Sequence, residues 1–443
     1  MGDATGEAVP TMESATGPNH VDTLSDVTLH PELSHSHKRN WIVAFIAVQF
    51  AVMILHMSSL GFSPMLPAIQ KEFGMGYGQM GLFTGMYGLI ALTMSVPSGL
   101  ATTRFGEKRV AVGGLIVSAL GLLLLAIAPN FGAAFGARAL WLIGYRFAFV
   151  NLLTALAVVS PPTFKGMSMG IMGAIMSFAS VVGASFGGGL ARDFGWRGAM
   201  LGFSGTAVLG TIIFCLFYRR GTNAASSMDQ PRSGSVHFRG ASPGLKSGNP
   251  FRTLVVWGLA VLAALCGMGQ FAATFFIPSV VESVFKLDVL AAAYIISTGY
   301  MAAIVANLLV GYLADHFNRW KVVIGALALM VPVSFAMTTK NLLVFRIAAA
   351  LVLALGVAIT GQVYAIAGEV LGKSRTGEVM GIVSLGAGVS TYVGPQVLGL
   401  LRDWTGGFSA GWYLLAAVAG LAAIETLFLW LHSRRREAMQ ATP

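Results

Sequence analysis

The chain has 443 residues, of which 55% are hydrophobic and 10% are charged, and its formal net charge is +10. A soluble globular chain is about 25% charged, so this composition cannot cover a water-facing surface and requires lipid as a solvent. The apolar runs are about 20 residues long, which is the length that a helix needs to cross a bilayer. Open sheets are excluded, because lipid cannot satisfy their edge N–H and C=O groups.

The positive charge does not indicate nucleic acid, because it lies in short loops and near the C-terminus, where orientation signals lie in membrane proteins. The two cysteines, Cys215 and Cys266, fall in apolar runs, and their spacing gives no disulfide or zinc framework. The sequence has no phosphate-binding loop, no paired catalytic carboxylates and no Ser/His/Asp arrangement on a soluble domain. We therefore expect neither an enzyme nor an ATP-driven pump, and no cofactor or metal.

Residues 1–39 are polar and contain Pro and Ser, and we expect a disordered cytoplasmic tail there. Six apolar segments then lie within 40–218, a polar linker follows at 219–252, and six more lie within 253–432, before a short tail at 433–443. The predicted fold is an all-α polytopic membrane protein with 12 transmembrane helices in two six-helix bundles. The segments predict helices at 41–63, 77–100, 108–128, 133–158, 166–190, 199–218, 253–278, 289–314, 320–338, 342–368, 377–401 and 410–432.

Basic residues recur in every second loop. Arg104, Lys108 and Arg109 follow the second segment, and Arg319 and Lys321 follow the eighth, whereas the alternate loops are close to neutral. Because cytoplasmic loops carry the excess of Lys and Arg, this pattern predicts that both termini and the linker are cytoplasmic, in a bacterial inner membrane.

The two halves of the sequence repeat. GLATTRFGEKR at 99–109 is echoed by GYLADHFNRWK at 311–321, and Met-Gly-Ile at 169–171 recurs at 380–382. Arg138, which opens the fourth segment, is echoed by Arg346, which opens the tenth. Secondary transporters are commonly built from such repeats, with the substrate at the repeat interface near the membrane midplane.

The loop at 311–321 resembles the signature of the major facilitator superfamily. It matches at Gly311, Leu313, Ala314, Asp315, Arg319 and Lys321. The loop at 99–109 matches at Gly99, Arg104, Gly106, Lys108 and more loosely Arg109, with Thr103 where the family has Asp. The resemblance covers roughly residues 40–435 and implies a secondary transporter in which two halves rock about a central site.

The resemblance also implies a gating role for the charges in these loops. We expect Asp315, Arg319 and Lys321 to form pairs that break when the cytoplasmic side opens, with Arg104, Lys108 and Arg346 as further gating residues. The alternative is that they only set the topology. Since Thr103 replaces an Asp, we expect a latch that relies more on the second half. Residues 183–188, GASFGG, resemble the family's antiporter signature, with Ala184 in the place of Pro.

Arg146 stands in the middle of the fourth segment, and no carboxylate occurs inside any apolar segment of the first half. Arginine does not lose its proton when it is buried. A cavity-facing arginine without a carboxylate partner suits an anionic substrate, whose charge completes the pair. Pairing with backbone carbonyls, or snorkelling towards the cytoplasmic end, is the structural alternative.

Three other polar residues of the first half are candidates. Arg138 matches the family's helix 4 arginine, for which the resemblance implies substrate binding or proton coupling. His56 titrates near neutral pH and is a candidate proton carrier, although a hydrogen-bonded packing histidine fits equally well. Gln49 lies two helical turns before His56 on the same face.

The second half offers neutral groups that can orient a small polar ligand. The candidates for substrate binding are Gln270, Tyr300, Asn307, Gln362 and Tyr392, each of which also suits a helix–helix hydrogen bond.

Together these residues predict a secondary active transporter that moves a small organic anion, with a carboxylate as the expected class, by alternating access. Symport with protons through His56 is an additional expectation. We expect its partners to be that solute, protons and the lipid bilayer, with no nucleic acid, and we expect a monomer. The first alternative is an exporter of lipophilic drugs or metabolites that uses walls formed by Met53, Met57, Phe271, Phe275 and Phe276. The second is a membrane sensor or scaffold that transports nothing.

Overall fold

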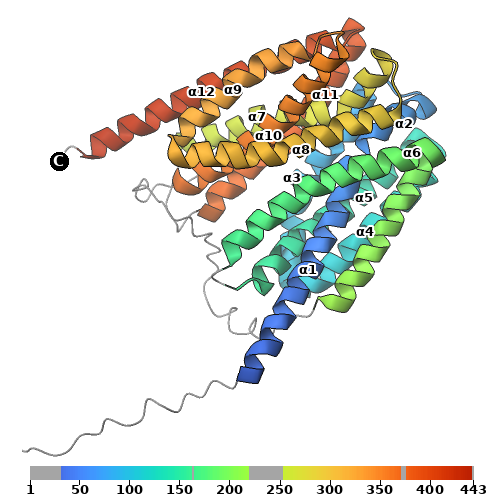
Figure 1. The fold of residues 1–443 in the computed structure, drawn as a ribbon, viewed down its shortest axis with the longest axis vertical. Helices are drawn as coiled ribbons and strands as arrows, with labels where there is room; N and C mark the ends of the chain where they lie inside the picture. The colour runs from blue at the N-terminus through green and yellow to red at the C-terminus, as the bar shows by residue number, and fades with distance from the viewer. Residues whose placement is uncertain (1–30, 162–163, 219–252, 371–375, 442–443) are drawn as a thin grey trace, which may run out of the picture.

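The computed structural model describes residues 31–161, 164–218, 253–370 and 376–441, which form helices and no strand (Figure 1). Unbroken helices are the expected solution in lipid, because they satisfy backbone groups within one segment. The elements are α1 (Pro31–Gly61), η1 (Ser63–Met65), α2 (Leu66–Phe73), α3 (Tyr77–Phe105), α4 (Glu107–Ala126), α5 (Phe131–Val159), α6 (Lys165–Phe217), α7 (Leu254–Ser283), α8 (Val289–His316), α9 (Arg319–Ala336), α10 (Leu342–Val370), α11 (Thr376–Thr405) and α12 (Ser409–Ala441).

Two helices extend into the predicted tails. α1 begins at Pro31, inside the predicted tail 1–39, and α12 ends at Ala441, inside the predicted tail 433–443. Once a helix exists, each further residue adds a hydrogen bond, so both helices run on into polar sequence. Residues 1–30 and the predicted linker 219–252 lie outside the described residues.

α6 contains two of the predicted segments. It is 53 residues long and breaks at Gly195, whose φ of 71° leaves the helical region, and Figure 1 shows its two arms side by side in opposite directions. Within the described residues, ten helices are long and apolar enough to cross a membrane, α6 among them, and α11 is not one of the ten. The architecture accommodates twelve crossings if α6 supplies two and α11 one; the count itself stays a prediction.

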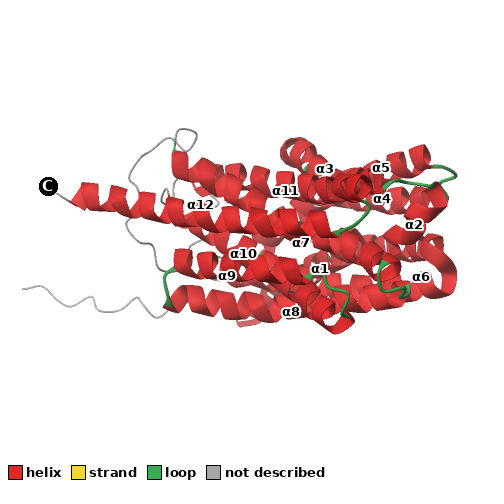
Figure 2. Cartoon of the chain, turned by 90° about the horizontal axis from the view of Figure 1, so that it is seen from above, coloured by secondary structure: helices red, strands yellow, loops and turns green. Residues whose placement is uncertain are grey.

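The helices form two halves, α1–α6 and α7–α12, which diverge towards the end where α1 begins and α12 ends (Figures 1 and 2). We call this the terminal end, and the opposite end, which holds α2 and the elbow of α6, the far end. Between the halves the main contacts are α3 with α11 and α6 with α8.

Glycines bring neighbouring helices within each half into backbone contact. A Cβ at Gly183 of α6 would lie 2.2 Å from the Met57 carbonyl of α1, and a Cβ at Gly394 of α11 would lie 2.5 Å from the Met268 carbonyl of α7. Both residues of the second contact lie 211 positions after those of the first (394 − 183 and 268 − 57), so the repeat read in the sequence is a repeat of packing. The GASFGG segment also faces α8, because a Cβ at Gly188 would lie 2.4 Å from that of Ala293.

The far end is sealed by contacts between the halves. The ring centroids of Phe62 and Phe275 lie 6.0 Å apart, and those of Tyr77 and Phe408 lie 5.4 Å apart. The hydroxyls of Ser185 and Ser297 are 2.9 Å apart. All the hydrogen bonds and ring contacts between described residues of the two halves lie between mid-depth and the far end.

A carboxylate of the second half caps a helix of the first. The N-cap residue of α3 is Gly76, which has no side chain to accept the first free N–H groups of the helix. Asp403 of α11 accepts them instead, from Tyr77 N at 2.9 Å and Gly78 N at 2.7 Å. In contrast, the corresponding helix of the second half, α8, is capped by its own Asp288. The far end therefore has a latch on one side of the interface, made by Asp403.

Replacing this cap should shift the protein towards opening of the far end. Loss of an N-cap side chain costs about 1 kcal/mol, so Asp403→Ala should raise the open fraction about fivefold, whereas Asp403→Asn, which still accepts one N–H, should have a smaller effect. Double electron–electron resonance between spin labels at Asp193 and Lys340, with Cys215 and Cys266 replaced, measures the distance across this end. An Asp403→Ala distance distribution identical to that of the parent would contradict the latch.

Candidate functional site

Arg146 lies at mid-depth on α5, where it is half-buried and faces the interface between the halves. Its Nε donates to the Ser95 hydroxyl of α3 at 2.8 Å. Among the described residues, no carboxylate lies within ion-pair distance of it. Its field reaches the phenols of Tyr87 and Tyr145 in the first half and of Tyr364 on α10 in the second. The guanidinium thus keeps donors available for a ligand between the halves.

A hydrogen-bonded chain leads from this region to His56 of α1. The Tyr87 hydroxyl donates to the Tyr145 hydroxyl at 3.1 Å, and the Tyr145 hydroxyl lies 3.0 Å from His56 Nδ1. With that donor assignment, the Tyr145 hydroxyl donates to Nδ1 of a neutral His56. When the imidazole is protonated, Nδ1 donates to the Tyr145 oxygen instead. The chain can therefore carry a proton between His56 and the neighbourhood of Arg146.

The second half places a matching polar group opposite Tyr87. The hydroxyls of Tyr300 on α8 and Thr274 on α7 lie 2.9 Å apart, and Gln270 hydrogen-bonds to Tyr300. The Tyr87 ring centroid lies 6.4 Å from that of Phe271, which is next to Gln270 in the chain. The predicted residues Arg146, His56, Tyr300 and Gln270 thus gather around one interface, which we call the central site.

The structure places other predicted binding residues elsewhere. Gln49 donates to the Ser168 carbonyl of α6 at 3.4 Å, so it joins two helices of the first half. Tyr392 of α11 packs its backbone against glycines of α3. Asn307 lies against Gly361. Gln362 lines a cavity of about 940 Å³ at the terminal end of the second half.

Arg138 is enclosed between the central site and the far end. It is fully buried, its Nε donates to the Phe83 carbonyl at 2.5 Å, and its guanidinium carbon lies 4.0 Å from the Phe62 ring centroid and 5.2 Å from that of Trp141. Phe62 is itself part of the seal with Phe275. Its guanidinium thus packs among aromatic rings, which attract cations through their π faces.

Most of the predicted gating residues lie at the terminal end, and their contacts stay within one half. Arg319 bridges Asp315 at 3.1 Å and Glu369 of α10 at 2.8 Å. Lys108 donates to the Tyr218 carbonyl at 2.7 Å, where α6 ends.

The remaining three are more isolated. Arg104 is exposed beside the Phe105 ring, and Lys321 lies 5.6 Å from the Trp430 ring centroid. Arg346 is exposed near the start of α10, at the end opposite to the other five.

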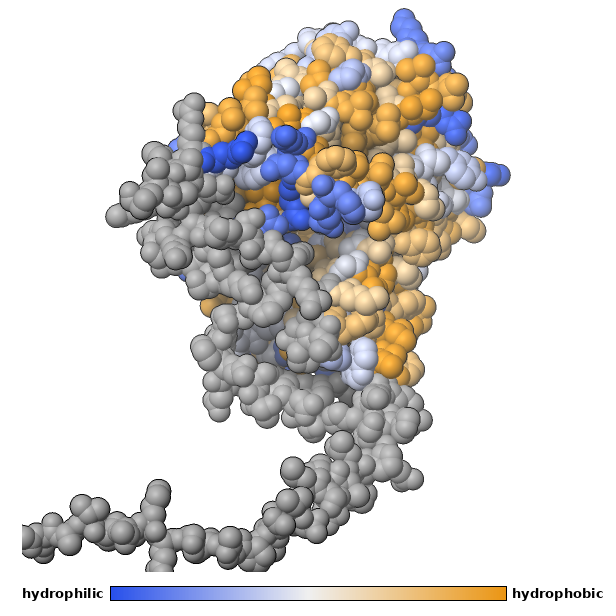
Figure 3. All heavy atoms as spheres, turned by 60° about the vertical axis from the view of Figure 1, so that its left-hand side comes forward, coloured by the Kyte–Doolittle hydropathy of each residue, from blue (hydrophilic) through white to orange (hydrophobic). Residues whose placement is uncertain are grey.

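The two halves diverge at the terminal end (Figures 1 and 2). Figure 3, which turns this end towards the viewer, shows hydrophilic side chains gathered beside a hollow. The cavity near Gln362 reaches from Arg319 to Tyr364, whose hydroxyl donates to the Ser384 hydroxyl of α11 at 3.3 Å. Tyr364 therefore lines this cavity and also interacts electrostatically with Arg146.

Sequence reasoning missed Tyr87, Tyr145, Thr274 and Ser95. Each stands in an apolar run where a hydroxyl or a phenol commonly bonds within its own helix or to a neighbour. Only Tyr145 carried a signal, because it precedes Arg146 in the chain and so lies at the same depth. Asp403 was also missed, although the absence of a capping side chain before α3 was visible in the sequence at Gly76.

Comparison with known proteins places the chain in a family. The Major Facilitator Superfamily profile matches residues 48–364 and 259–443. A probable sulfoacetate transporter of Cupriavidus necator, SauU, is 20% identical over 408 residues, which are 88% of this chain and 94% of that protein. The Bacillus subtilis MFS-type transporter YhcA is 28% identical over 153 residues, which are 34% of this chain and only 28% of that protein.

Among solved structures, a bacterial homologue of the human lysosomal transporter Spinster, in an inward-facing and unoccupied conformation, superposes with a TM-score of 0.72 at 17% identity. The match covers 90% of this chain and 98% of that one, and it shows that the two share a fold. With the profile matched over most of the described helices, the chain is a member of the Major Facilitator Superfamily of transporters.

Proposed function

We propose that this transporter carries a small organic anion by alternating access, with Arg146 as the group that binds the anionic charge. The observation that carries the proposal is a permanent cation at mid-depth with no described carboxylate partner, held by Ser95 and ringed by phenols. A substrate carboxylate or sulfonate would supply the missing charge and accept from the guanidinium in the bidentate geometry that arginine favours. The relative of similar length that is described as a probable sulfoacetate transporter supports the same class of solute.

The orientation that we propose places the terminal end in the cytoplasm of a bacterial cell. The basic residues at this end whose side chains the structure describes are Arg104, Lys108, Arg109, Arg319, Lys321 and Arg434. At the far end acidic and basic residues are mixed, as in the pair of Glu72 and Arg197. Because Lys and Arg concentrate on the cytoplasmic side, the protein then lies open to the cytoplasm. We expect it to act as a monomer.

The exporter alternative has less support. Phe275 and Phe276 are fully buried among other apolar side chains, and Met57 is 5% exposed, so in this conformation they pack the interior of the protein. Phe271 alone of the proposed aromatic wall lies beside the central site, against Tyr87. An unpaired arginine at that site also disfavours cationic drugs.

Removing the charge of Arg146 should abolish most of the transport. Arg146→Gln should lower uptake of labelled sulfoacetate into proteoliposomes about tenfold or more, because a hydrogen bond to a charged group contributes about 1.5–3 kcal/mol. Arg146→Lys keeps the charge but not the planar guanidinium, so its uptake should lie between that of the wild type and that of Arg146→Gln. Arg192→Gln, at an exposed arginine of the α6 elbow, is the matched control. Wild-type uptake by a folded Arg146→Gln protein would remove Arg146 from the site, and transport of lipophilic cations alone would favour the exporter.

We further propose that His56 carries the coupling proton. An inward proton gradient should then accelerate uptake by the wild type, and His56→Gln should lose this acceleration, because the chain through Tyr145 would end on a group that does not titrate. Exchange of labelled for unlabelled anion at equal pH needs no net proton movement, so it should persist in the variant. Gradient-driven accumulation by His56→Gln at the wild-type level would show that the proton travels elsewhere.

A further inference from the structure

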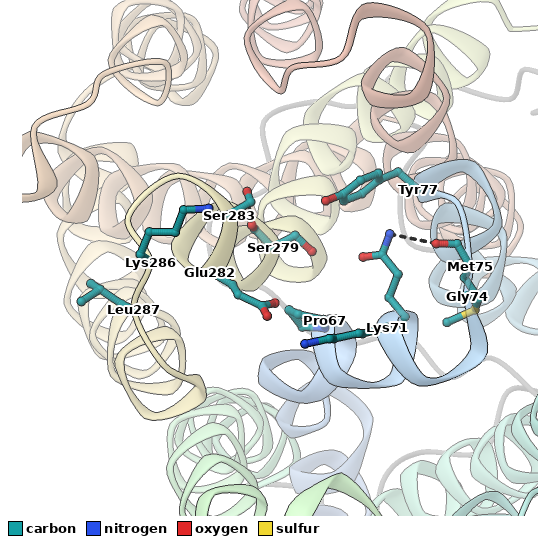
Figure 4. A pocket seen from close by; sticks show the side chains of 11 residues that line it. Pro67, Lys71, Gly74, Met75, Tyr77, Ser279, Glu282, Ser283, Lys286 and Leu287 are labelled. Carbon is teal, nitrogen blue, oxygen red and sulfur yellow. Dashed lines mark hydrogen bonds between the residues drawn. The ribbon is translucent and has the colours of Figure 1, made fainter.

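A polar pocket lies outside the seal, at the far end. It has a volume of about 710 Å³, and both halves line it, α2 and the start of α3 on one side and the end of α7 on the other (Figure 4). Its floor belongs to the seal itself. Tyr77 packs on Phe408 of the other half, and the Ser279 hydroxyl contacts the Met80 sulfur across the interface. Separation of the halves at this end would therefore join the pocket to the central site.

The charges that line the pocket are two lysines and one glutamate. Lys71 comes from α2 in the first half, whereas Glu282 and Lys286 come from the end of α7 in the second. In the described part of the chain, neither ammonium has a carboxylate within ion-pair distance. Figure 4 shows the Glu282 carboxylate on the side of Pro67 and Lys71, with the Lys286 ammonium turned towards Ser283. The lining thus has a net positive charge and several hydroxyl and amide groups beside it.

Lys286 occupies a backbone position that suits glycine. Its φ is 57°, and it is the sole described non-glycine residue with a positive φ. The turn that holds it is closed by the Leu287 N–H, which donates to the Val281 carbonyl at 3.2 Å. Glycine normally ends helices in this conformation because it has no Cβ to strain. A lysine in such a strained position suggests that its positive charge has a function.

We propose that this pocket is an outer docking site for the transported anion. It would hold a small carboxylate or sulfonate between Lys71 and Lys286 while the seal is still shut, and release it to Arg146 when the far end opens. A net positive charge in a cleft raises the local concentration of anions, and here two lysines outweigh one glutamate. The inference rests on the proposed function, because it assumes that the solute is an anion.

Variants that remove a positive or a negative charge from the pocket test the proposed docking site. Lys286→Gly removes the charge and also the backbone strain, so it should weaken docking without lowering thermal stability. Glu282→Gln removes the carboxylate and should strengthen docking. Lys71→Gln should weaken it from the other half. Lys340→Gln, at an exposed far-end lysine outside the pocket, is the matched control.

The measurement is the initial rate of uptake of labelled sulfoacetate and of labelled acetate, presented on the far-end side of sealed vesicles at about 10 mM salt. A cation about 10 Å from a dianion in water should change the half-saturating concentration about fourfold, and that for a monoanion about twofold. We expect an increase in Lys286→Gly and Lys71→Gln, a decrease in Glu282→Gln and no change in Lys340→Gln. The differences should vanish at about 1 M salt, where the screening length is about 3 Å.

Binding of sulfoacetate to the detergent-purified Arg146→Gln protein gives a second readout, since the central site has then lost its arginine while the outer pocket is unchanged. Residual binding that Lys286→Gly removes would support the proposal. Half-saturating concentrations equal to that of the wild type in all three pocket variants, with uptake intact, would overturn the docking site and leave the proposed function standing. Absence of both anion uptake and anion binding in the wild type would overturn the two together.

Discussion

The unpaired guanidinium of Arg146 is the constraint on which the rest of the account depends. It stands at mid-depth in an apolar bundle, and one of its donors is satisfied by Ser95. In the present conformation its side chain is half-buried. Closing the terminal end on an empty site would bury an uncompensated charge, at a cost of about 3–5 kcal/mol. An anion that pairs with Arg146 removes this cost, so binding of the anion favours closure of the terminal end.

The far end shows the complementary arrangement, because the described residues form its seal without pairs of opposite charges between the halves. Aromatic rings, glycine-mediated backbone contacts and the Asp403 cap on α3 join the halves there. Each contact is individually weak. Because the seal consists of apolar contacts and one helix cap, the halves can separate there without breaking an ion pair. The buried Arg138, stacked against Phe62, lies directly beneath this seal. Opening of the far end would expose a second cation on the side from which the outer pocket is reached.

Much of the fold could be predicted from the sequence, because the length and spacing of apolar runs decide where a chain crosses lipid. The bounds of α1 and α12 could not, since apolarity does not say how far a helix continues into polar sequence. The repeat was visible as an offset of 211 in Met169 and Met380 (380 − 169), and the same offset appears in the glycine contacts. Arg146 was identified because a charge in an apolar run is conspicuous. Tyr87 and Tyr145 were not, because a sequence gives the face of a helix but not the helix that it meets.

The most direct test of the central claim is whether the anion closes the terminal end through Arg146. Spin labels at Thr103 and Phe317, which are exposed at the terminal end of each half, with the native cysteines replaced, report the distance across the opening by double electron–electron resonance. The account predicts that sulfoacetate shortens this distance in the wild type, and that Arg146→Gln, which no longer buries an unpaired charge, closes equally with and without the anion. A distance that the anion leaves unchanged in the wild type, or shortens equally in the wild type and in Arg146→Gln, would contradict the claim.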